Sequence, residues 1–406
     1  MSRRPISRSE DLRRLEADGY TLAIVGGKLV VSNVPFVDGG GVVHRDGALV
    51  MTLTLAGDVA QPPEDHTASF VGGTPCDRHG RELSKMINGR GKSNLGDGII
   101  VDCTFSMKPD TNGGRYRDLH DKVTKYVGAI SGHAAALDAA ATARLYKPVV
   151  PADDDDTTFK YLDTASSRAG IDALNEKLKD EKVAIIGLGG SGEYILDFVT
   201  KTHVSEIHPF DEDIYLTHNA FRGPGAPTLE ELNAAPLKVG HFTAIYSNMR
   251  TGIIPHAYAI NADNVHELRD MTFVFIAIDD APAKRPIIDA LIEMEIPFID
   301  VGMGVNEVAG RLTGVVRTTI VTPDHHDHVA DHIKLIDAGF DDDYHRTIQI
   351  AELNARNASD AVIRWKKYRG IYADMTGELS SAFSIATNHI VNEPPAPSAD
   401  GEAECA

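Results

Sequence analysis

Between residues 183 and 302 the chain alternates short apolar runs with amphipathic stretches. The run Val183–Ile186 is typical of a strand buried on both faces, and Glu193–Thr202 then carries apolar residues at helical spacing. The apolar run Phe273–Ile278, the amphipathic stretch Pro282–Met294 and the run Pro297–Gly302 continue the alternation. This order predicts an α/β fold with a doubly wound, mostly parallel sheet.

The pattern before residue 150 is different. From Tyr20 to Leu55, and again in Asp65–Gly80 and Gly98–Ser106, short extended runs are separated by Gly and Pro, which predicts a small antiparallel sheet. We therefore expect a smaller α+β domain over residues 1–150, an acidic linker over 151–160, a second domain over 161–392 and a disordered tail over 393–406. Further elements that we expect are helices over Leu119–Ala143, Tyr161–Leu178, Lys238–Met249 and Ile348–Tyr372, a strand over Gly252–Ile260 and an edge strand over Arg311–Thr319.

A glycine-rich turn joins the first strand of the second domain to its first helix. Gly187, Gly189 and Gly192 satisfy G-x-G-x-x-G, and Gly190 adds a fourth glycine. Such a turn lets the backbone approach a phosphate, and the helix N-terminus presents free N–H groups to it. A second strand, Glu206–Phe210, ends at Asp211, where an acid is expected to meet ribose hydroxyls. The sequence thus predicts a Rossmann-like nucleotide-binding unit.

The residues that follow indicate which nucleotide is bound. They are Asp211 and Asp213 in a D-x-D pattern, Asn219 and Arg222 in N-x-x-R, and later Lys238 and Asp279. Together with the glycines, this order resembles the ThiF-type adenylating family, which includes ubiquitin-activating enzymes and the activators of sulfur-carrier proteins. The resemblance covers residues 161–392. The preceding domain resembles an uncharacterised domain found ahead of ThiF-type modules in bacterial proteins.

The resemblance implies ATP and Mg²⁺ as cofactors and a ubiquitin-like or sulfur-carrier-like protein as partner. In that reaction a C-terminal carboxylate attacks the α-phosphate of ATP and pyrophosphate leaves. It also implies a homodimer in which Arg168 reaches the partner's triphosphate. The roles carried over are phosphate binding by Arg222 and Lys238, ribose binding by Asp211 with Asp213 beside it, a phosphate or metal-shell contact by Asn219, and magnesium binding by Asp279.

The charges fit that interpretation without the family. A triphosphate requires cations beyond a helix dipole, which Arg222 and Lys238 supply, and magnesium prefers a hard carboxylate such as Asp279. Two alternatives stay open: an NAD(P)-dependent oxidoreductase on the same fold, and a non-catalytic nucleotide-binding module.

Composition narrows the classes of partner. The 406 residues carry a formal net charge of −19, which argues against nucleic acid, and no run of 18 apolar residues predicts a membrane span. The start of the chain has no apolar signal-peptide region, and three cysteines do not suggest a disulfide scaffold. We therefore expect a cytoplasmic protein.

Three further features could carry chemistry. Cys76, beside Arg78 and His79, could be a thiolate nucleophile, although a small structural cysteine is the favoured interpretation, and Cys405 is the less suitable alternative. Residues 89–93 end like a phosphate-binding loop but lack its first glycine, so we expect a basic turn. The histidines of residues 325–332 could bind a metal, an interpretation that the absence of nearby cysteines disfavours.

Overall fold

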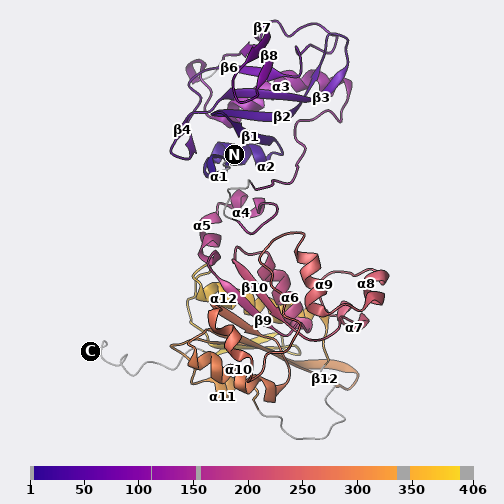
Figure 1. Cartoon of the computed structure of the whole chain (residues 1–406), viewed down its shortest axis with the longest axis vertical. Coiled ribbons are helices and arrows are strands. Elements are labelled where there is room, and N and C mark those ends of the chain that lie inside the picture. The colour runs from indigo at the N-terminus through magenta and orange to yellow at the C-terminus, as the bar shows by residue number, and fades with distance from the viewer. Residues whose placement is uncertain (1–3, 111, 152–156, 336–347, 394–406) are drawn as a thin grey trace, which may run out of the picture. The chain divides into compact units, whose positions relative to one another are not determined.

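The computed structural model describes residues 4–110, 112–151, 157–335 and 348–393 (Figure 1). The chain separates into two compact units. Unit 1 comprises residues 1–157 and 161–171, and unit 2 comprises residues 158–160 and 172–406. Within the described residues, no helix combines the length and apolarity needed to cross a membrane.

Unit 1 is built on an antiparallel sheet with the strand order β1-β2-β3-β6-β8-β7. Its apolar face packs against the long helix α3, with Phe70, Phe105 and Tyr126 among the buried rings. The strands and helices are α1 (Arg4–Arg8), α2 (Glu10–Ala17), β1 (Thr21–Val25), β2 (Lys28–Val37), β3 (Val43–Thr52), β4 (Leu55–Ala56), β5 (Val59–Ala60), β6 (Thr67–Val71), β7 (Ile87–Asn94), β8 (Ile100–Ser106), the 3₁₀ turn η1 (Asn112–Gly114), α3 (Leu119–Leu137) and α4 (Thr164–Ala169).

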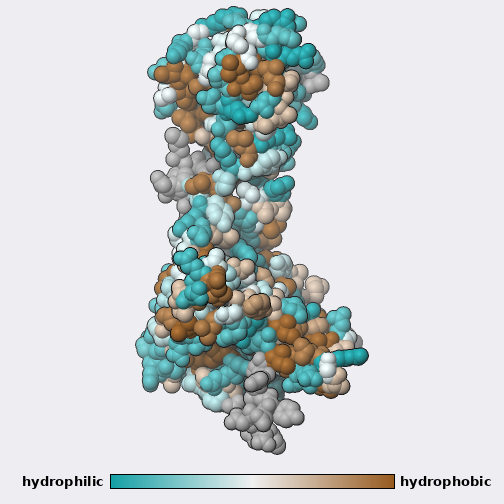
Figure 2. All heavy atoms as spheres, turned by 90° about the vertical axis from the view of Figure 1, so that its right-hand side faces the viewer, coloured by the Kyte–Doolittle hydropathy of each residue, from teal (hydrophilic) through white to brown (hydrophobic). Residues whose placement is uncertain are grey.

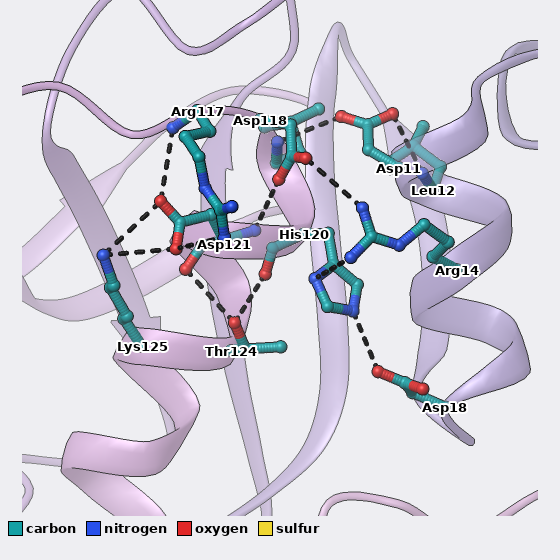
Figure 3. A network of polar contacts seen from close by, with 11 residues as sticks. Asp11, Leu12, Arg14, Asp18, Arg117, Asp118, His120, Asp121, Thr124 and Lys125 are labelled. Atoms are coloured by element: carbon teal, nitrogen blue, oxygen red, sulfur yellow. Dashed lines mark hydrogen bonds and ion pairs between the residues drawn. The ribbon is translucent and has the colours of Figure 1, made fainter. Parts of the chain in front are cut away.

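A polar network fastens α2 to the start of α3 (Figure 3). Asp118 caps α3 by accepting the Asp121 N–H at 2.7 Å, and Asp11 accepts the Leu119 N–H at 3.0 Å. His120 bonds Asp18 through Nε2 at 2.9 Å and lies 3.4 Å from an Arg14 nitrogen. These contacts satisfy free N–H groups at the helix start, and they fix where the apolar face of α3 meets the sheet.

Unit 2 is built on a mixed sheet, seven strands wide among the described residues, with the order β10-β9-β11-β12-β13-β14-β15. The pairs from β10 to β12 are parallel, and those from β12 to β15 are antiparallel. Its strands are β9 (Lys182–Ile186), β10 (Glu206–Phe210), β11 (Phe273–Ile276), β12 (Phe298–Val308), β13 (Arg311–Val321), β14 (Ser380–Ser384) and β15 (His389–Glu393).

Helices cover both faces of the parallel part. Helices α6, α9 and α12 pack against one face of β9 and β11 and form one hydrophobic core. The elements η3 and α10 pack against the opposite face and form another. The helical elements are α5 (Asp172–Asn175), η2 (Glu176–Leu178), α6 (Gly190–Thr200), α7 (Thr217–Ala220), α8 (Leu229–Ala234), α9 (Lys238–Tyr246), η3 (Val265–Asp270), α10 (Ala281–Glu293), α11 (Val329–His332) and α12 (Ala351–Tyr368). The predicted Rossmann-like α/β fold behind an antiparallel-sheet domain is confirmed.

Several predicted elements differ in detail. The helix over Tyr161–Leu178 is broken at Gly170, which adopts φ 70° and ends α4. The stretch Gly252–Ile260 makes only single bridges beside β10, because Pro209 of β10 has no N–H to donate to the Ile254 carbonyl between those bridges. Residues 89–93 are part of β7 rather than a turn.

The strand predicted at an edge over Arg311–Thr319 lies inside the sheet. Strand β13 extends over Arg311–Val321 and pairs with β12 on one side and β14 on the other. The prediction missed this because β14 and β15 come from residues beyond 379, after the long helix α12. The helix expected over Leu119–Ala143 ends at Leu137, where Asp138 turns to extended backbone.

Candidate functional site

The carboxyl ends of three parallel strands meet at one edge of the unit 2 sheet. Ile186 of β9 lies in register with Phe210 of β10 and with Ile276 of β11. The residues that follow each strand, Gly187, Asp211 and the segment 277–279, therefore leave the sheet at the same edge. This is the edge at which open α/β sheets bind ligands.

Three of the four loop glycines are required by close packing. Gly187 has φ 89°, and a Cβ there would lie 2.7 Å from an Ile278 methyl carbon and 2.9 Å from the Ala277 carbonyl oxygen. A Cβ on Gly192 would collide with the Gly187 carbonyl oxygen, and one on Gly190 would collide with the Asn354 amide. These glycines let strand, loop and helix approach one another.

Gly189 is the exception. It is the N-cap of α6 with φ −88°, and a Cβ placed on it would meet no atom within 4 Å. The loop therefore turns an open backbone position outward at the N-terminus of an eleven-residue helix, where N–H groups and the helix dipole favour an anion.

Asp211 ties the glycine loop to a buried cation. Its carboxylate accepts the Leu188 N–H at 2.7 Å and the Asp213 N–H at 2.9 Å. The ammonium of Lys238, the first residue of α9, lies 3.3 Å from Asp211 and 2.7 Å from Asp213. Asp211 and Lys238 are buried, whereas the Asp213 side chain is 67% exposed. A phosphate approaching Lys238 competes with the exposed carboxylate more readily than with the buried one.

A tight turn carries the next two predicted residues. Asn219 is fully buried and accepts the Leu216 N–H at 2.8 Å, and the Gly223 N–H returns to the Asn219 carbonyl at 3.0 Å. The Asn219 Nδ2 and the Arg222 Nε are buried donors without a hydrogen-bond partner among the described residues. Unused donors of this kind suit an anionic ligand.

Sequence reasoning missed Glu193, in the first turn of α6. Its side chain is fully buried, and burial raises its pKa to about 8 against the opposing attraction of Arg222 and Lys238. Its place directly after the last loop glycine is the one signal that could have drawn attention to it.

Sequence reasoning also missed Asn354, which reaches the site from α12. Its amide donates to the Arg222 carbonyl at 3.1 Å, and its oxygen accepts the Ser191 hydroxyl at 3.3 Å. Asn354 thus joins the glycine loop to the turn that carries Arg222. No local motif announces this role, because Asn354 is separated from the turn by more than a hundred residues.

Asp279 lies just beyond β11 and is exposed, and the next residue, Asp280, caps α10 by accepting the Ala283 N–H at 3.1 Å. In the part of the chain that the structure describes, no group of three or more His, Cys, Asp or Glu side chains is arranged to hold a metal ion. A magnesium ion at Asp279 would therefore depend on phosphate oxygens for further ligands, as magnesium commonly does.

One predicted site residue, Arg168, belongs to unit 1. Arg168 is exposed on α4, in unit 1, where it lines a cavity of about 370 Å³ together with Arg13 and Arg14. The other predicted site residues all belong to unit 2.

Cys76 and two histidines of residues 325–332 make contacts that are typical of structural residues. Cys76 is buried and its thiol contacts the Thr74 carbonyl, and burial together with nearby carboxylates raises its pKa. The structure therefore favours a small structural cysteine over a nucleophile. Cys405 lies outside the described residues. Of the histidines, His328 bonds the Ile320 carbonyl at 2.8 Å, and His332 pairs with Glu393 at 2.7 Å.

Two segments of the chain match known protein families. Residues 10–164 match a domain of unknown function (DUF6791), and residues 164–332 match the ThiF family. The ThiF match covers 169 of the 406 residues, so this segment of the chain is similar to the ThiF family. The predicted resemblance is thereby confirmed, and the domain that precedes it has a matching family of its own. A search of curated proteins gave no match.

Solved structures of MccB and PaaA are similar to this chain. Crystal structures of E. coli MccB with ATP (16% identity, TM-score 0.44, 60% of this chain and 73% of that chain) and with succinimide (17%, 0.43, 54% and 66%) are among them. A selenomethionine PaaA structure is another, with 20% identity, TM-score 0.45, and coverage of 67% and 85%. The chain thus spans slightly less than two thirds of the length of the MccB chain in the succinimide structure.

Proposed function

We propose that the ThiF-family domain binds Mg·ATP and adenylates the C-terminal carboxylate of a peptide or small protein. The observation that carries the proposal is the open backbone at Gly189, which shares one sheet edge with the cations Arg222 and Lys238. The helix N-terminus alone would suit many anions. Two additional cations, one with a buried unused Nε, suit a triphosphate better than the diphosphate of a nicotinamide cofactor.

The proposed reaction needs no side-chain base, because a C-terminal carboxylate is already ionised at neutral pH. A carboxylate oxygen forms a bond to the α-phosphorus, the bond from that phosphorus to the bridging oxygen breaks, and pyrophosphate leaves. Arg222 and Lys238 neutralise the charge that develops on the departing group. Asp211 holds the ribose beside the glycine loop, and Asn219 donates to a phosphate oxygen. A magnesium ion at Asp279 would add charge neutralisation.

The carboxylate donor that we propose is a ubiquitin-like or sulfur-carrier-like protein, or a shorter peptide. The structures similar to this chain include MccB in complex with a peptide named MccA, which motivates the shorter alternative. No cysteine occurs in residues 161–392, so we propose that the reaction ends at the acyl-adenylate unless another protein supplies a thiol.

We further propose that the protein works as a homodimer through unit 2. Several apolar side chains are exposed in the segment between β10 and the end of α9. This segment includes α7, α8 and α9, which lie on the side of unit 2 that faces the viewer in Figure 2. Phe221 is 81% and Leu229 74% exposed. Phe221→Ser should convert a dimer to a monomer in light scattering. A monomeric wild-type protein that is fully active would contradict both the dimer and the role of Arg168 in the partner's site.

The test of adenylation is exchange of labelled pyrophosphate into ATP with peptides that end in a free carboxylate, and the same peptides with a C-terminal amide as control. Arg222→Ala should reduce exchange by one to two orders of magnitude, because it removes a charge-assisted contact worth about 1.5–3 kcal/mol. Lys238→Ala should also reduce exchange, and it should lower stability because Asp211 keeps an uncompensated buried charge.

Lys92→Ala, on β7 of unit 1, is the matched control for loss of a basic side chain. It should change neither the rate of pyrophosphate exchange nor the stability of the protein. Calorimetry with ATP and NAD completes the test. Tight NAD binding without ATP binding would replace the proposal with an oxidoreductase, and ATP binding without exchange would favour a non-catalytic module.

A further inference from the structure

Glu193 is a buried carboxyl group in the first turn of α6, directly after the glycine loop of the proposed nucleotide site. Its exposure is 0%, and both of its carboxyl oxygens lack a hydrogen-bond partner among the described residues. Burying such a group costs free energy that a conventional structural role would recover through hydrogen bonds. No hydrogen bond among the described residues recovers it, which points to a role for this carboxyl group at the site.

The carboxyl group packs under the turn that carries Arg222. A Cβ built on Gly223 would collide with the Oε2 of Glu193, so only a glycine allows this approach. The backbone N–H of Gly223 bonds the Asn219 carbonyl at 3.0 Å, which places the carboxyl group against the N-x-x-R turn itself.

Charged and titratable groups face Glu193 from each element around it. Arg222 from the turn and Lys238 from α9 attract its negative charge, and Asp211 repels it. Burial raises the pKa values of the phenols of Tyr194 on α6, Tyr215 before the turn and Tyr246 on α9, and the charge of Glu193 raises them further. Burial outweighs the two cations and raises the pKa of Glu193 to about 8.

We propose that Glu193 is a positioning residue that couples nucleotide binding to one proton. When the carboxyl group is neutral, the charges of Arg222 and Lys238 are available to the phosphates. When it is ionised, it competes with the phosphates for the same two cations. The inference rests on the proposed nucleotide site.

The direction of the effect follows from linkage. Bound phosphates add negative charge beside Glu193 and favour its protonated form, so the pKa of Glu193 is higher in the complex than in the free protein. ATP affinity is then independent of this group at neutral pH. It falls above about pH 8, by up to tenfold per pH unit, until the pKa of the complex is reached.

The experiment is calorimetric titration of the full chain with Mg·AMPCPP, a non-hydrolysable ATP analogue, from pH 7 to 9.5 in buffers of different ionisation enthalpy. The wild type should bind with constant affinity to about pH 8 and lose affinity above it, with net proton uptake that approaches one per site. Glu193→Gln should bind like the wild type at pH 7, since Gln resembles the neutral acid, and should lose the alkaline fall. Glu352→Gln, an exposed position in the first turn of α12, is the control and should keep the wild-type profile.

Two results would overturn the inference. One is a Glu193→Gln protein whose pH profile matches that of the wild type. The other is zero proton uptake by the wild type at pH 8.5, a measurement that does not depend on any variant folding. Absence of nucleotide binding at every pH would instead refute the nucleotide site, and the role of Glu193 with it.

Discussion

Gly189 and Gly192 lie three positions apart in one loop, but their surroundings differ. Gly189 has ordinary backbone angles and open space where a side chain would be. Gly192 packs against the carbonyl oxygen of Gly187 and lies near the Ala277 side chain. One glycine is therefore available to a ligand, and the other is needed by the fold.

This contrast predicts opposite effects of the same substitution. Gly189→Ala should lower the free energy of unfolding by only about 0.5–1 kcal/mol, because alanine is a poorer N-cap than glycine, and it should weaken ATP binding tenfold or more. Gly192→Ala should destabilise the protein by about 1–3 kcal/mol through overpacking. Urea unfolding and ATP titration of both variants check the prediction, and equal effects on stability would contradict it.

The ionisation of Glu193 also affects stability. Its pKa is about 8 in the folded chain and 4.5 for an ordinary glutamate. Below about pH 4.5 Glu193 is protonated in both the folded and the unfolded chain, so it takes nothing from the free energy of unfolding. As the pH rises from about 4.5 to about 8, the unfolded chain ionises and the folded chain does not, so the free energy of unfolding falls. Between these values the loss is at most about 1.4 kcal/mol per pH unit.

Glu193→Gln should lack this pH dependence. The difference in unfolding free energy between wild type and variant, measured in urea from pH 5 to 9, should shift in favour of the variant as pH rises and level off above about pH 8. A difference that does not change with pH would show that Glu193 titrates as an ordinary exposed glutamate.

At the scale of elements, the crossing of α6 and α12 holds the site together. The two helices approach closely because Gly190 leaves room for Asn354, whose side chain bonds both Ser191 and the Arg222 carbonyl. One turn further along α12, Asn357 also bonds Ser191, and it bonds the Thr318 hydroxyl and the Gly302 carbonyl as well. Both residues thus hold Ser191, whereas the Arg222 turn is held by Asn354 alone of the two and the sheet by Asn357.

Asn354→Ala should cost about 1–3 kcal/mol of stability, because it leaves a buried carbonyl without its donor, and it should also weaken ATP binding by loosening the Arg222 turn. Asn357→Ala is the matched control. It should cost similar stability with a smaller effect on affinity, since it has no contact with that turn. Equal losses of affinity in the two variants would show that helix packing in general, and not the Asn354 contact, positions Arg222.

At the scale of the whole molecule, the two units have separate cores. The core of unit 1 contains Phe70, Phe105 and Tyr126, and the cores of unit 2 lie on the two faces of its own sheet. Because a domain with a hydrophobic core of its own commonly unfolds as one cooperative unit, we expect the two units to unfold separately.

Scanning calorimetry of the intact chain should therefore show two transitions. Mg·ATP at 100 times its dissociation constant should stabilise unit 2 by about 2.7 kcal/mol and raise only its transition. Phe70→Ala, which removes a buried ring, should lower only the transition of unit 1. A single transition that responds to both changes would show that the units unfold together.

The sequence alone determined the nucleotide-binding unit and its order of chemical groups. Val183–Ile186, the glycines from Gly187 to Gly192 and Asp211 all lie within residues 183–211, so local pattern dictates strand, loop, helix and strand. The spacing of Asn219 and Arg222 was equally visible, because one short turn carries both.

Only the tertiary structure decided which groups meet. Asn354 contacts Gly190, β13 becomes an inner strand, and Lys238 pairs with Asp211, all through packing between segments distant in the chain. The burial of Glu193 depends on the Gly223 turn folding over the first turn of α6. A residue's pattern along the chain reveals its local conformation, whereas its solvation and its partners depend on which distant segments the folded sheet brings beside it.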